Sequence, residues 1–279
     1  ASHCGGIGLR ALSLVDLASW DVAARMEDRS IAELLGGSAQ PMPATAIIGY
    51  PPASIGPKEI GAQVAELWQA GWRRFKAPVG ATPEVSAARL RAARAAAPAG
   101  WLGCDGAWIF DEVGPAADFA RSIYDVRLGW FEDIFPPGAA APLAALAAAL
   151  ATPIAMGDEQ GGAYYPQALI RPGAVDVVRI DLTCMGGITG ARRIVDECLS
   201  AGVAFAPHMF AHVHSQVFSA WGFPDLPIEW GLPWTGVDPY ADSLAQPREA
   251  ERLYTCDPRL GGTGDPALQR THNWRDAAR

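Results

Sequence analysis

The feature that most constrains the fold is a rhythm of short apolar runs, each ending in a polar or acidic residue. Every run is followed by an amphipathic or Ala-rich stretch of helical length. The apolar runs predict eight strands: Thr45–Tyr50, Arg73–Lys76, Trp101–Asp105, Leu128–Glu132, Pro153–Met156, Val175–Asp181, Val203–Ala206 and Leu226–Glu229. The stretches between them predict seven helices: Pro57–Ala70, Pro83–Ala97, Ile109–Tyr124, Pro142–Leu150, Tyr165–Ile170, Thr189–Ala201 and His212–Trp221.

Strands that alternate with helices in this way are typical of parallel βα units. Eight such units close a barrel better than they fit an open sheet, and a barrel of this kind takes about 250 residues. A doubly wound open sheet is the alternative. The phosphate-binding loop that is usual in doubly wound sheets is missing from this sequence. Neither G-x-G-x-x-G nor G-x-x-x-x-G-K-S/T follows any predicted strand. The sequence therefore predicts a (β/α) barrel.

We expect the barrel to occupy residues 38–240, between two shorter segments. Residues 1–37 carry a helical period from Leu12 to Leu35 that is closed by Gly36 and Gly37, so they predict a lead-in helix. Residues 241–279 predict a C-terminal extension that packs on the barrel or on a capping region.

Composition excludes several classes of partner. The net charge of −8 argues against a nucleic-acid surface, which would be basic. No apolar run reaches the roughly 20 residues needed to span a bilayer, and no signal-peptide pattern begins the sequence. The five cysteines are odd in number and lack C-x-x-C spacing, which predicts reduced thiols in a cytoplasmic protein.

Charged residues recur at the predicted strand ends, about 20 to 30 residues apart, which is close to the length of one βα unit. They are Lys76, Asp105, Glu132, Asp158, Asp181, His208 and Glu229. In a parallel barrel, catalytic groups stand at the C-terminal ends of the strands. A single strand-end Asp can equally be a helix N-cap. Seven such residues in step with the strands predict one shared site at the mouth of the barrel.

Three acids on consecutive strands, Asp105, Glu132 and Asp158, would converge on one side of this mouth. Such a cluster cannot stay ionised at close range without a cation. Ligands that are all oxygen select a hard metal, so the cluster predicts an octahedral Mg²⁺ site. At the fifth strand Glu159 is the alternative to Asp158.

A candidate base lies across the mouth, where Asp181 and His208 end adjacent strands. A carboxylate that hydrogen-bonds one ring nitrogen fixes the tautomer and raises the basicity of the other nitrogen. Lys76, one of only two lysines in the chain, adds a point charge that can hold a substrate oxyanion.

Read in chain order, these motifs resemble the enolase superfamily, in its mandelate racemase/muconate lactonizing enzyme-like branch. The segments that carry the resemblance are Leu14–Asp21 with Leu34–Gly37, Trp130–Asp133, Ile154–Glu159, Asp181–Gly190, Pro207–His208 and Ile228–Trp230. The sixth-strand motif from Asp181, with His208 one unit later, is the specific part of the likeness.

The resemblance implies proton abstraction from the carbon next to a carboxylate. His208 would take the proton with Asp181 as its partner, while Mg²⁺, Lys76 and a protonated Glu229 would stabilise the doubly charged enolate. The expected partner is a small-molecule carboxylate, and the resemblance favours a homo-oligomer.

The second predicted strand departs from the family pattern. The family often ends this strand with Lys-x-Lys, whose second lysine is a base on the face opposite the histidine. Here Pro78 takes that place and cannot accept a proton. One base favours the dehydration of an acid sugar to a 2-keto-3-deoxy acid. The alternatives are a racemase or epimerase with its second base from Lys58, Tyr50 or outside the chain, a cycloisomerase, and a non-catalytic barrel.

Two further departures leave alternatives open. If Gly106-Ala107-Trp108 is aligned with the family, Gly103 falls on the metal-ligand position and Asp105 on an asparagine. If the strand end is aligned, Asp105 is the ligand, and its spacing to Glu132 favours this register. The chain also begins too late to contain the family's N-terminal capping domain, so either the sequence is incomplete or residues 1–37 are a remnant of that domain.

Four residues are weaker candidates for substrate contact: Tyr50, His212, His214 and Trp230. For each of them, packing is the plain alternative.

Overall fold

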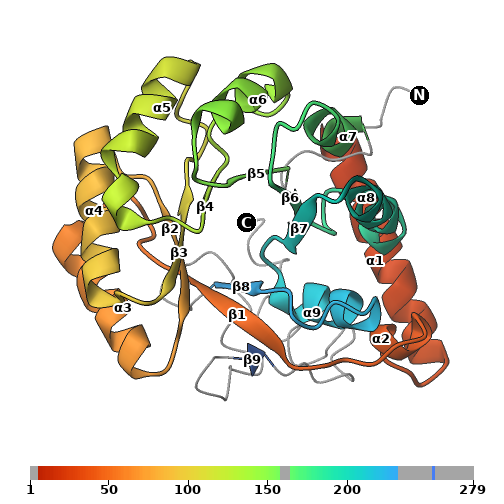
Figure 1. The fold of residues 1–279 in the computed structure, drawn as a ribbon. Coiled ribbons are helices and arrows are strands. Elements are labelled where there is room, and N and C mark those ends of the chain that lie inside the picture. The colour runs from red at the N-terminus through yellow and green to blue at the C-terminus, as the bar shows by residue number, and fades with distance from the viewer. Residues whose placement is uncertain (1–5, 158–163, 232–252, 255–279) are drawn as a thin grey trace, which may run out of the picture.

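The computed structural model describes residues 6–157, 164–231 and 253–254. Eight parallel strands form a nearly closed ring with the helices outside it (Figure 1). The hydrogen-bonded order is β7-β6-β5-β4-β3-β2-β1-β8. The strands are β1 Met42–Ile47, β2 Arg74–Pro78, β3 Trp101–Asp105, β4 Trp130–Glu132, β5 Ile154–Met156, β6 Val177–Ile180, β7 Ala204–Pro207 and β8 Ile228–Gly231.

Two of the described helices precede β1, and the later helices connect successive strands, as in parallel βα units. The helices are α1 Gly6–Met26, α2 Ile31–Leu34, α3 Pro57–Gln69, α4 Pro83–Ala96, α5 Val113–Ser122, η1 Tyr124–Val126, α6 Ala140–Ala149, α7 Tyr164–Ile170, α8 Gly187–Ala201 and α9 Ala211–Ala220. No helix in the described ranges is long and apolar enough to cross a membrane.

The predicted barrel is confirmed, and most predicted elements lie within a few residues of the observed ones. The first strand is displaced, since β1 begins at Met42 and ends at Ile47, so that Tyr50 lies in the following loop. The third predicted helix, α5 in the structure, starts at Val113 instead of Ile109. Ala107 and Trp108 have positive φ angles of 47° and 58°. This left-handed turn after β3 delays the helix, and it has no periodic signal in the sequence.

The ring has a seam where the two ends of the hydrogen-bonded order, β7 and β8, meet. A side chain bridges this seam, because the backbone N–H of Met209 donates to Glu229 Oε2 over 3.1 Å. The seam therefore lies beside the predicted His208 and Glu229.

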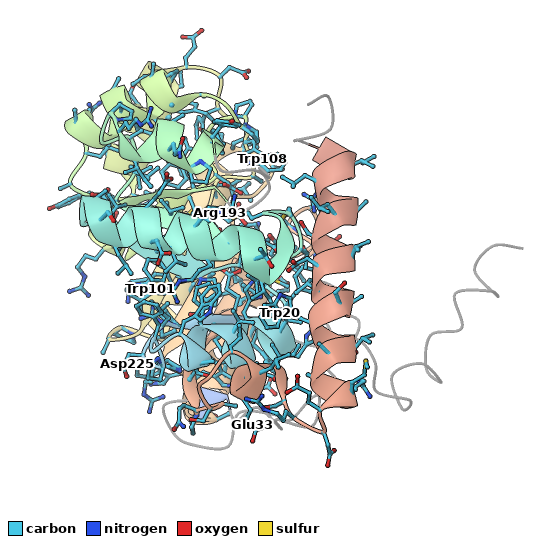
Figure 2. All side chains as sticks on the ribbon, turned by 90° about the vertical axis from the view of Figure 1, so that its right-hand side faces the viewer. Trp20, Glu33, Trp101, Trp108, Arg193 and Asp225 are labelled. Atoms are coloured by element: carbon cyan, nitrogen blue, oxygen red, sulfur yellow. The ribbon has the colours of Figure 1, made fainter. Side chains whose placement is uncertain are left out.

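The predicted lead-in helix is α1, which lies outside the ring and packs on α8 (Figures 1 and 2). Ser13 Oγ accepts a hydrogen bond of 2.8 Å from the N–H of Gly186, and Asp16 Oδ2 accepts one of 3.2 Å from the N–H of Thr189. Trp20, on the side of α1 that faces the barrel in Figure 2, donates to Thr189 Oγ1 over 3.3 Å. These contacts hold α1 over the start of α8.

Part of the predicted C-terminal extension also touches the barrel. Strand β9 (Leu253–Tyr254) pairs antiparallel with β1, with Met42 opposite Tyr254. The rest of residues 241–279 lies outside the described residues, so the domain boundaries stay a prediction.

The lower interior of the barrel is filled by two indole rings. Trp101 and Trp130 meet edge to face, with 4.7 Å between ring centroids. A Cβ on Gly103 would lie 2.7 Å from the Trp101 ring, so no side chain fits at that position without a shift. The guanidinium carbon of Arg74 lies 4.1 Å from the centroid of Trp101, and that of Arg179 lies 4.8 Å from the centroid of Trp130.

Candidate active site

The floor of the barrel mouth is an ion-pair cluster around Lys76. Its Nζ lies 2.7 Å from Glu132 Oε1 and 2.8 Å from Glu229 Oε1. Asp105 Oδ2 is farther away, at 3.8 Å. Lys76, Glu132 and Glu229 are buried, so water screens these charges little. The structure thus joins predicted residues from β2, β3, β4 and β8.

The burial of these charges shifts their pKa values in different directions. Burial alone would lower the pKa of Lys76, but Glu132, Glu229 and Asp105 outweigh it and raise that pKa well above its usual value. Burial raises the pKa of Glu132 to about 7, against the lowering effect of Arg179 and Lys76. For Glu229 the same two cations outweigh burial and lower the pKa. This direction favours the carboxylate form of Glu229, whereas the family resemblance implies a protonated donor.

Sequence reasoning missed Arg179, which lies in β6 and is fully buried. Its guanidinium forms an ion pair with Glu229 through Nη2, and its Nε lies 3.5 Å from Glu132 Oε2. The sequence does contain a signal for Arg179, because this residue interrupts an apolar strand and precedes Asp181 by two residues. That spacing places both side chains on the same face of the strand.

The predicted base and its partner are in contact. His208 Nδ1 lies 3.0 Å from Asp181 Oδ2, while Asp181 Oδ1 accepts two hydrogen bonds of 2.7 Å from the N–H and the hydroxyl of Thr183. Burial opposes ionisation of Asp181, but the hydrogen bond from His208 is among the contacts that outweigh it and lower the pKa. An ionised Asp181 makes Nδ1 the protonated ring nitrogen and leaves Nε2 as the basic one.

A cavity of about 400 Å³ opens over these groups. Its lining includes Lys76, Asp105, Asp181 and His208, so the base and the acidic cluster face one space. Tyr50 also lines the cavity, as the sequence predicts, and its hydroxyl lies 3.5 Å from Asp105 Oδ2. Burial, followed by the nearby charge of Asp105, raises the pKa of Tyr50, so its phenol keeps its proton.

Arg10, a half-buried residue of α1, lines the same cavity and was missed at the sequence level. The sequence carries no local signal for it. Arg10 reaches the barrel mouth only because α1 packs on α8.

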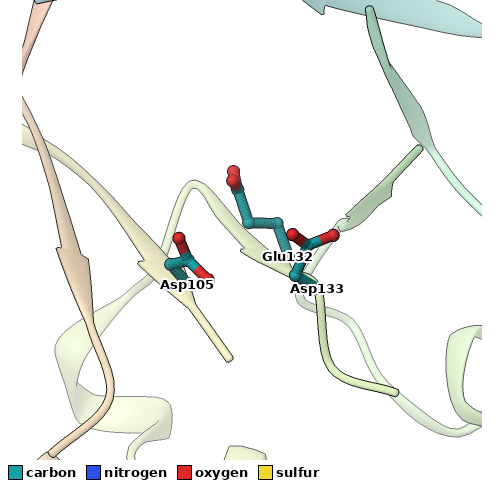
Figure 3. Close-up of side chains that lie close together, drawn as sticks. All are labelled: Asp105, Glu132 and Asp133. Carbon is teal, nitrogen blue, oxygen red and sulfur yellow. The ribbon is translucent and has the colours of Figure 1, made fainter. Parts of the chain in front are cut away.

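Three carboxylates at the ends of β3 and β4 could hold a cation (Figure 3). Asp105, Glu132 and Asp133 each place an oxygen within 4.8 Å of the others. Among the described residues, no donor forms a hydrogen bond with the buried Glu132 Oε2. All of the candidate ligand atoms are oxygens, and one carboxylate includes a buried oxygen without a hydrogen bond. Such a set of ligands fits a hard divalent cation.

Asp133 belongs to the fourth-strand segment that carries the family resemblance, but no role as a ligand was predicted for it from the sequence alone. It follows Glu132 directly, and along a strand it would point to the other face. Its φ of 49° turns the chain at the end of β4 and returns its carboxylate to the cluster. The predicted ligand Asp158 and its alternative Glu159 lie outside the described residues.

The remaining candidates lie away from the cavity as it is described. His214 is fully buried, where its Nε2 accepts from the N–H of Leu182 over 3.1 Å and its Nδ1 donates to the carbonyl of Phe210 over 3.1 Å. His212 and Trp230 are also buried, at 7% and 2% exposure. None of the three is among the residues described as lining the cavity.

Known proteins with similar sequences carry the name of a dehydratase family. A "D-galactonate dehydratase family member" of Catenulispora acidiphila is 29% identical over 233 residues, which cover 73% of this chain and 53% of the relative. Another protein of that name, from a Streptomyces species, is 27% identical over 310 residues, 95% of this chain and 65% of the relative. The chain thus spans about half to two thirds of the length of these curated relatives.

Solved structures share the fold. An L-talarate dehydratase from a Polaromonas species, crystallised with Mg and L-glucarate, superposes with a TM-score of 0.80 at 24% identity. The superposition covers 96% of this chain and 74% of the other. A family model described as "Enolase C-terminal domain-like" matches residues 59–247, more than half of the chain. On this match, and with the barrel and its strand-end residues in place, the chain belongs to the enolase C-terminal domain-like family.

Proposed function

We propose that this chain is the barrel of an enzyme that removes the α-proton of a carboxylate substrate, and that its reaction is the dehydration of an acid sugar to a 2-keto-3-deoxy acid. The observation that carries the proposal is the His208–Asp181 pair, joined at 3.0 Å and facing the same cavity as Lys76 and Asp105. A base, a lysine that can bind a carboxylate and a candidate metal ligand therefore meet in one space.

In this proposal His208 Nε2 takes the proton from the carbon next to the substrate carboxylate. Asp181 holds the ring and stabilises the imidazolium that forms. The electron pair left on the carbon expels the β-hydroxyl, which leaves as water with the proton from His208. The resulting enol tautomerises to the 2-keto acid.

The enolate needs positive charge because both of its negative charges develop near the carboxylate. Lys76 supplies one such charge from the floor of the cavity. Asp105, Glu132 and Asp133 would hold Mg²⁺, with Asp158 or Glu159 as the further ligand predicted from the sequence. Bound there, Mg²⁺ supplies Lewis-acid stabilisation of the enolate oxygens.

Racemisation needs a second base on the opposite face of the substrate carbon, and the lack of a suitable candidate among the described residues favours dehydration. Pro78, at the place of the second lysine, lies in β2 beside Asp105 of β3 and cannot accept a proton. Tyr50 lines the cavity, but its raised pKa makes it a poor base at neutral pH. Lys58 lies exposed on α3. The curated dehydratase relatives support the same preference.

The test is a screen of acid sugars in which each reaction is followed twice, by 2-keto acid formation and by exchange of the α-proton in D₂O. The full chain should form 2-keto acid from at least one sugar. His208→Asn should lose at least about a hundredfold in that rate, because a general base contributes roughly 10²- to 10⁴-fold. Its Mg²⁺ affinity, measured by calorimetry, should stay at the wild-type value.

Other results select the alternatives. Exchange of the α-proton without loss of water favours a racemase or epimerase, and ring closure of the substrate favours a cycloisomerase. Dehydration by His208→Asn at the wild-type rate would overturn the role of His208. A chain that neither binds Mg²⁺ nor exchanges any proton would be a non-catalytic barrel.

A further inference from the structure

Arg179 connects two glutamates from opposite parts of the barrel. Its side chain is fully buried. The Nη2 atom pairs with Glu229 of β8, and the Nε atom lies 3.5 Å from Glu132 Oε2 of β4. The ring of Trp130 lies against the guanidinium, with 4.8 Å between Cζ and the ring centroid, and so helps to hold it between the two carboxylates.

Arg179 also completes a charge balance. Lys76 and Arg179 are positive, and they contact Glu132 and Glu229 in one buried cluster. A buried carboxylate without a cation is strongly destabilising. The chain's own cations therefore already compensate the glutamates of this floor before any metal binds.

The two oxygens of Glu132 have different surroundings. Oε1 takes the ion pair with Lys76 at 2.7 Å. Oε2 accepts no hydrogen bond from the described residues, and the Nε of Arg179 lies 3.5 Å from it. A positive charge this close to a ligand oxygen reduces the negative potential that attracts a divalent ion, and the low dielectric of a buried site strengthens the effect.

We propose that Arg179 is a resident counter-cation that stabilises Glu132 and Glu229 in the metal-free protein and weakens Mg²⁺ binding at the same cluster. This inference rests on the metal site of the proposed function. An arginine that merely positions Glu132 for the metal has the opposite effect, because its loss would weaken binding. The sign of the change in affinity therefore separates the two roles.

The experiment is a calorimetric titration of the full chain with Mg²⁺ alone. Arg179→Gln should bind Mg²⁺ at least about tenfold more tightly than the wild type. Its melting temperature without metal should fall, and Mg²⁺ should raise that temperature by more than it does in the wild type.

Arg74→Gln is the matched control. Arg74 is the guanidinium that stacks on Trp101 in the same interior layer, and it donates to Thr45 Oγ1 over 3.3 Å. Within the described ranges it forms no ion pair with a carboxylate. Its loss should therefore change the Mg²⁺ affinity by less than about threefold.

Equal or weaker Mg²⁺ binding by Arg179→Gln overturns the inference. If that variant cannot be isolated, Arg179→Lys decides, since its single ammonium cannot serve both glutamates as the guanidinium does. Its affinity should rise by about threefold or more, and an unchanged or lower affinity overturns the inference. If the wild type binds no Mg²⁺, the result contradicts the proposed function itself, on which this inference rests.

Discussion

At the scale of single residues, burial and ion pairing together set the charge state of the ionisable groups in the site. The sequence identifies Lys76, Glu132 and Glu229 as members of one site, because each ends a strand. It does not show that they contact one another, and it does not reveal that Arg179 joins them. Ion pairs form across the barrel between residues about 50 or more positions apart, so no local pattern encodes them.

His214 illustrates the same point and carries a prediction. Burial lowers its pKa to about 4, from a usual value of 6.5. Between these pH values the unfolded chain binds a proton here and the folded protein does not. The contribution of His214 to the free energy of unfolding therefore falls as the pH drops from about 6.5 to 4, by up to roughly 3 kcal/mol.

Urea denaturation at a series of pH values tests this expectation. His214→Gln should be less stable than the wild type near pH 7, because its amide must replace two buried hydrogen bonds. It should also lose less stability between pH 7 and pH 4.5. Parallel pH profiles for the two proteins would contradict the assignment to His214.

At the scale of elements, the Gly186-Gly187 pair explains how a helix outside the barrel reaches the active site. Gly187 has a φ of +71°, and a Cβ there would lie 2.2 Å from Asp16 Oδ2 of α1. The missing side chain lets α1 approach the start of α8, and this approach brings Arg10 to the cavity. The sequence marks both segments as motifs, but only the structure shows that they contact each other.

Gly187→Ala should therefore weaken the docking of α1. We expect a loss of about 2–4 kcal/mol in the free energy of unfolding, from left-handed strain together with overpacking. Gly202→Ala is the matched control, because Gly202 ends α8 with a φ of +67° and a Cβ added there would meet no described atom within 4 Å. It should show the strain alone, at about 1–2 kcal/mol. Equal losses in urea denaturation would mean that α1 does not depend on this contact.

At the scale of the whole molecule, the barrel collects charges from all around the ring. Glu132 belongs to β4 and Glu229 to β8, yet Lys76 contacts both. Neighbouring strands β3 and β4 also bring Asp105 next to Glu132 in register. A cation bound by Asp105, Glu132 and Asp133 would connect the ends of β3 and β4, so its binding should stabilise the fold.

Thermal unfolding with and without Mg²⁺ measures this link. At about 100 times the dissociation constant, Mg²⁺ should add about 2.7 kcal/mol to the free energy of unfolding and raise the melting temperature by several degrees. Glu132→Gln should lose this shift. Glu66→Gln, which changes an exposed glutamate on α3, should keep it. A shift that persists in Glu132→Gln would place the metal elsewhere.

The sequence by itself determined the barrel, because apolar periodicity depends on each local stretch alone, and it determined that Asp181 and His208 belong to one mouth. Tertiary structure decided the rest. Arg10, Asp133 and Arg179 join the site through helix docking, a positive φ and a cross-barrel ion pair, none of which is a local property. His214 and Trp230 are buried, which the sequence could not show either, because burial depends on packing between segments that are far apart in the chain.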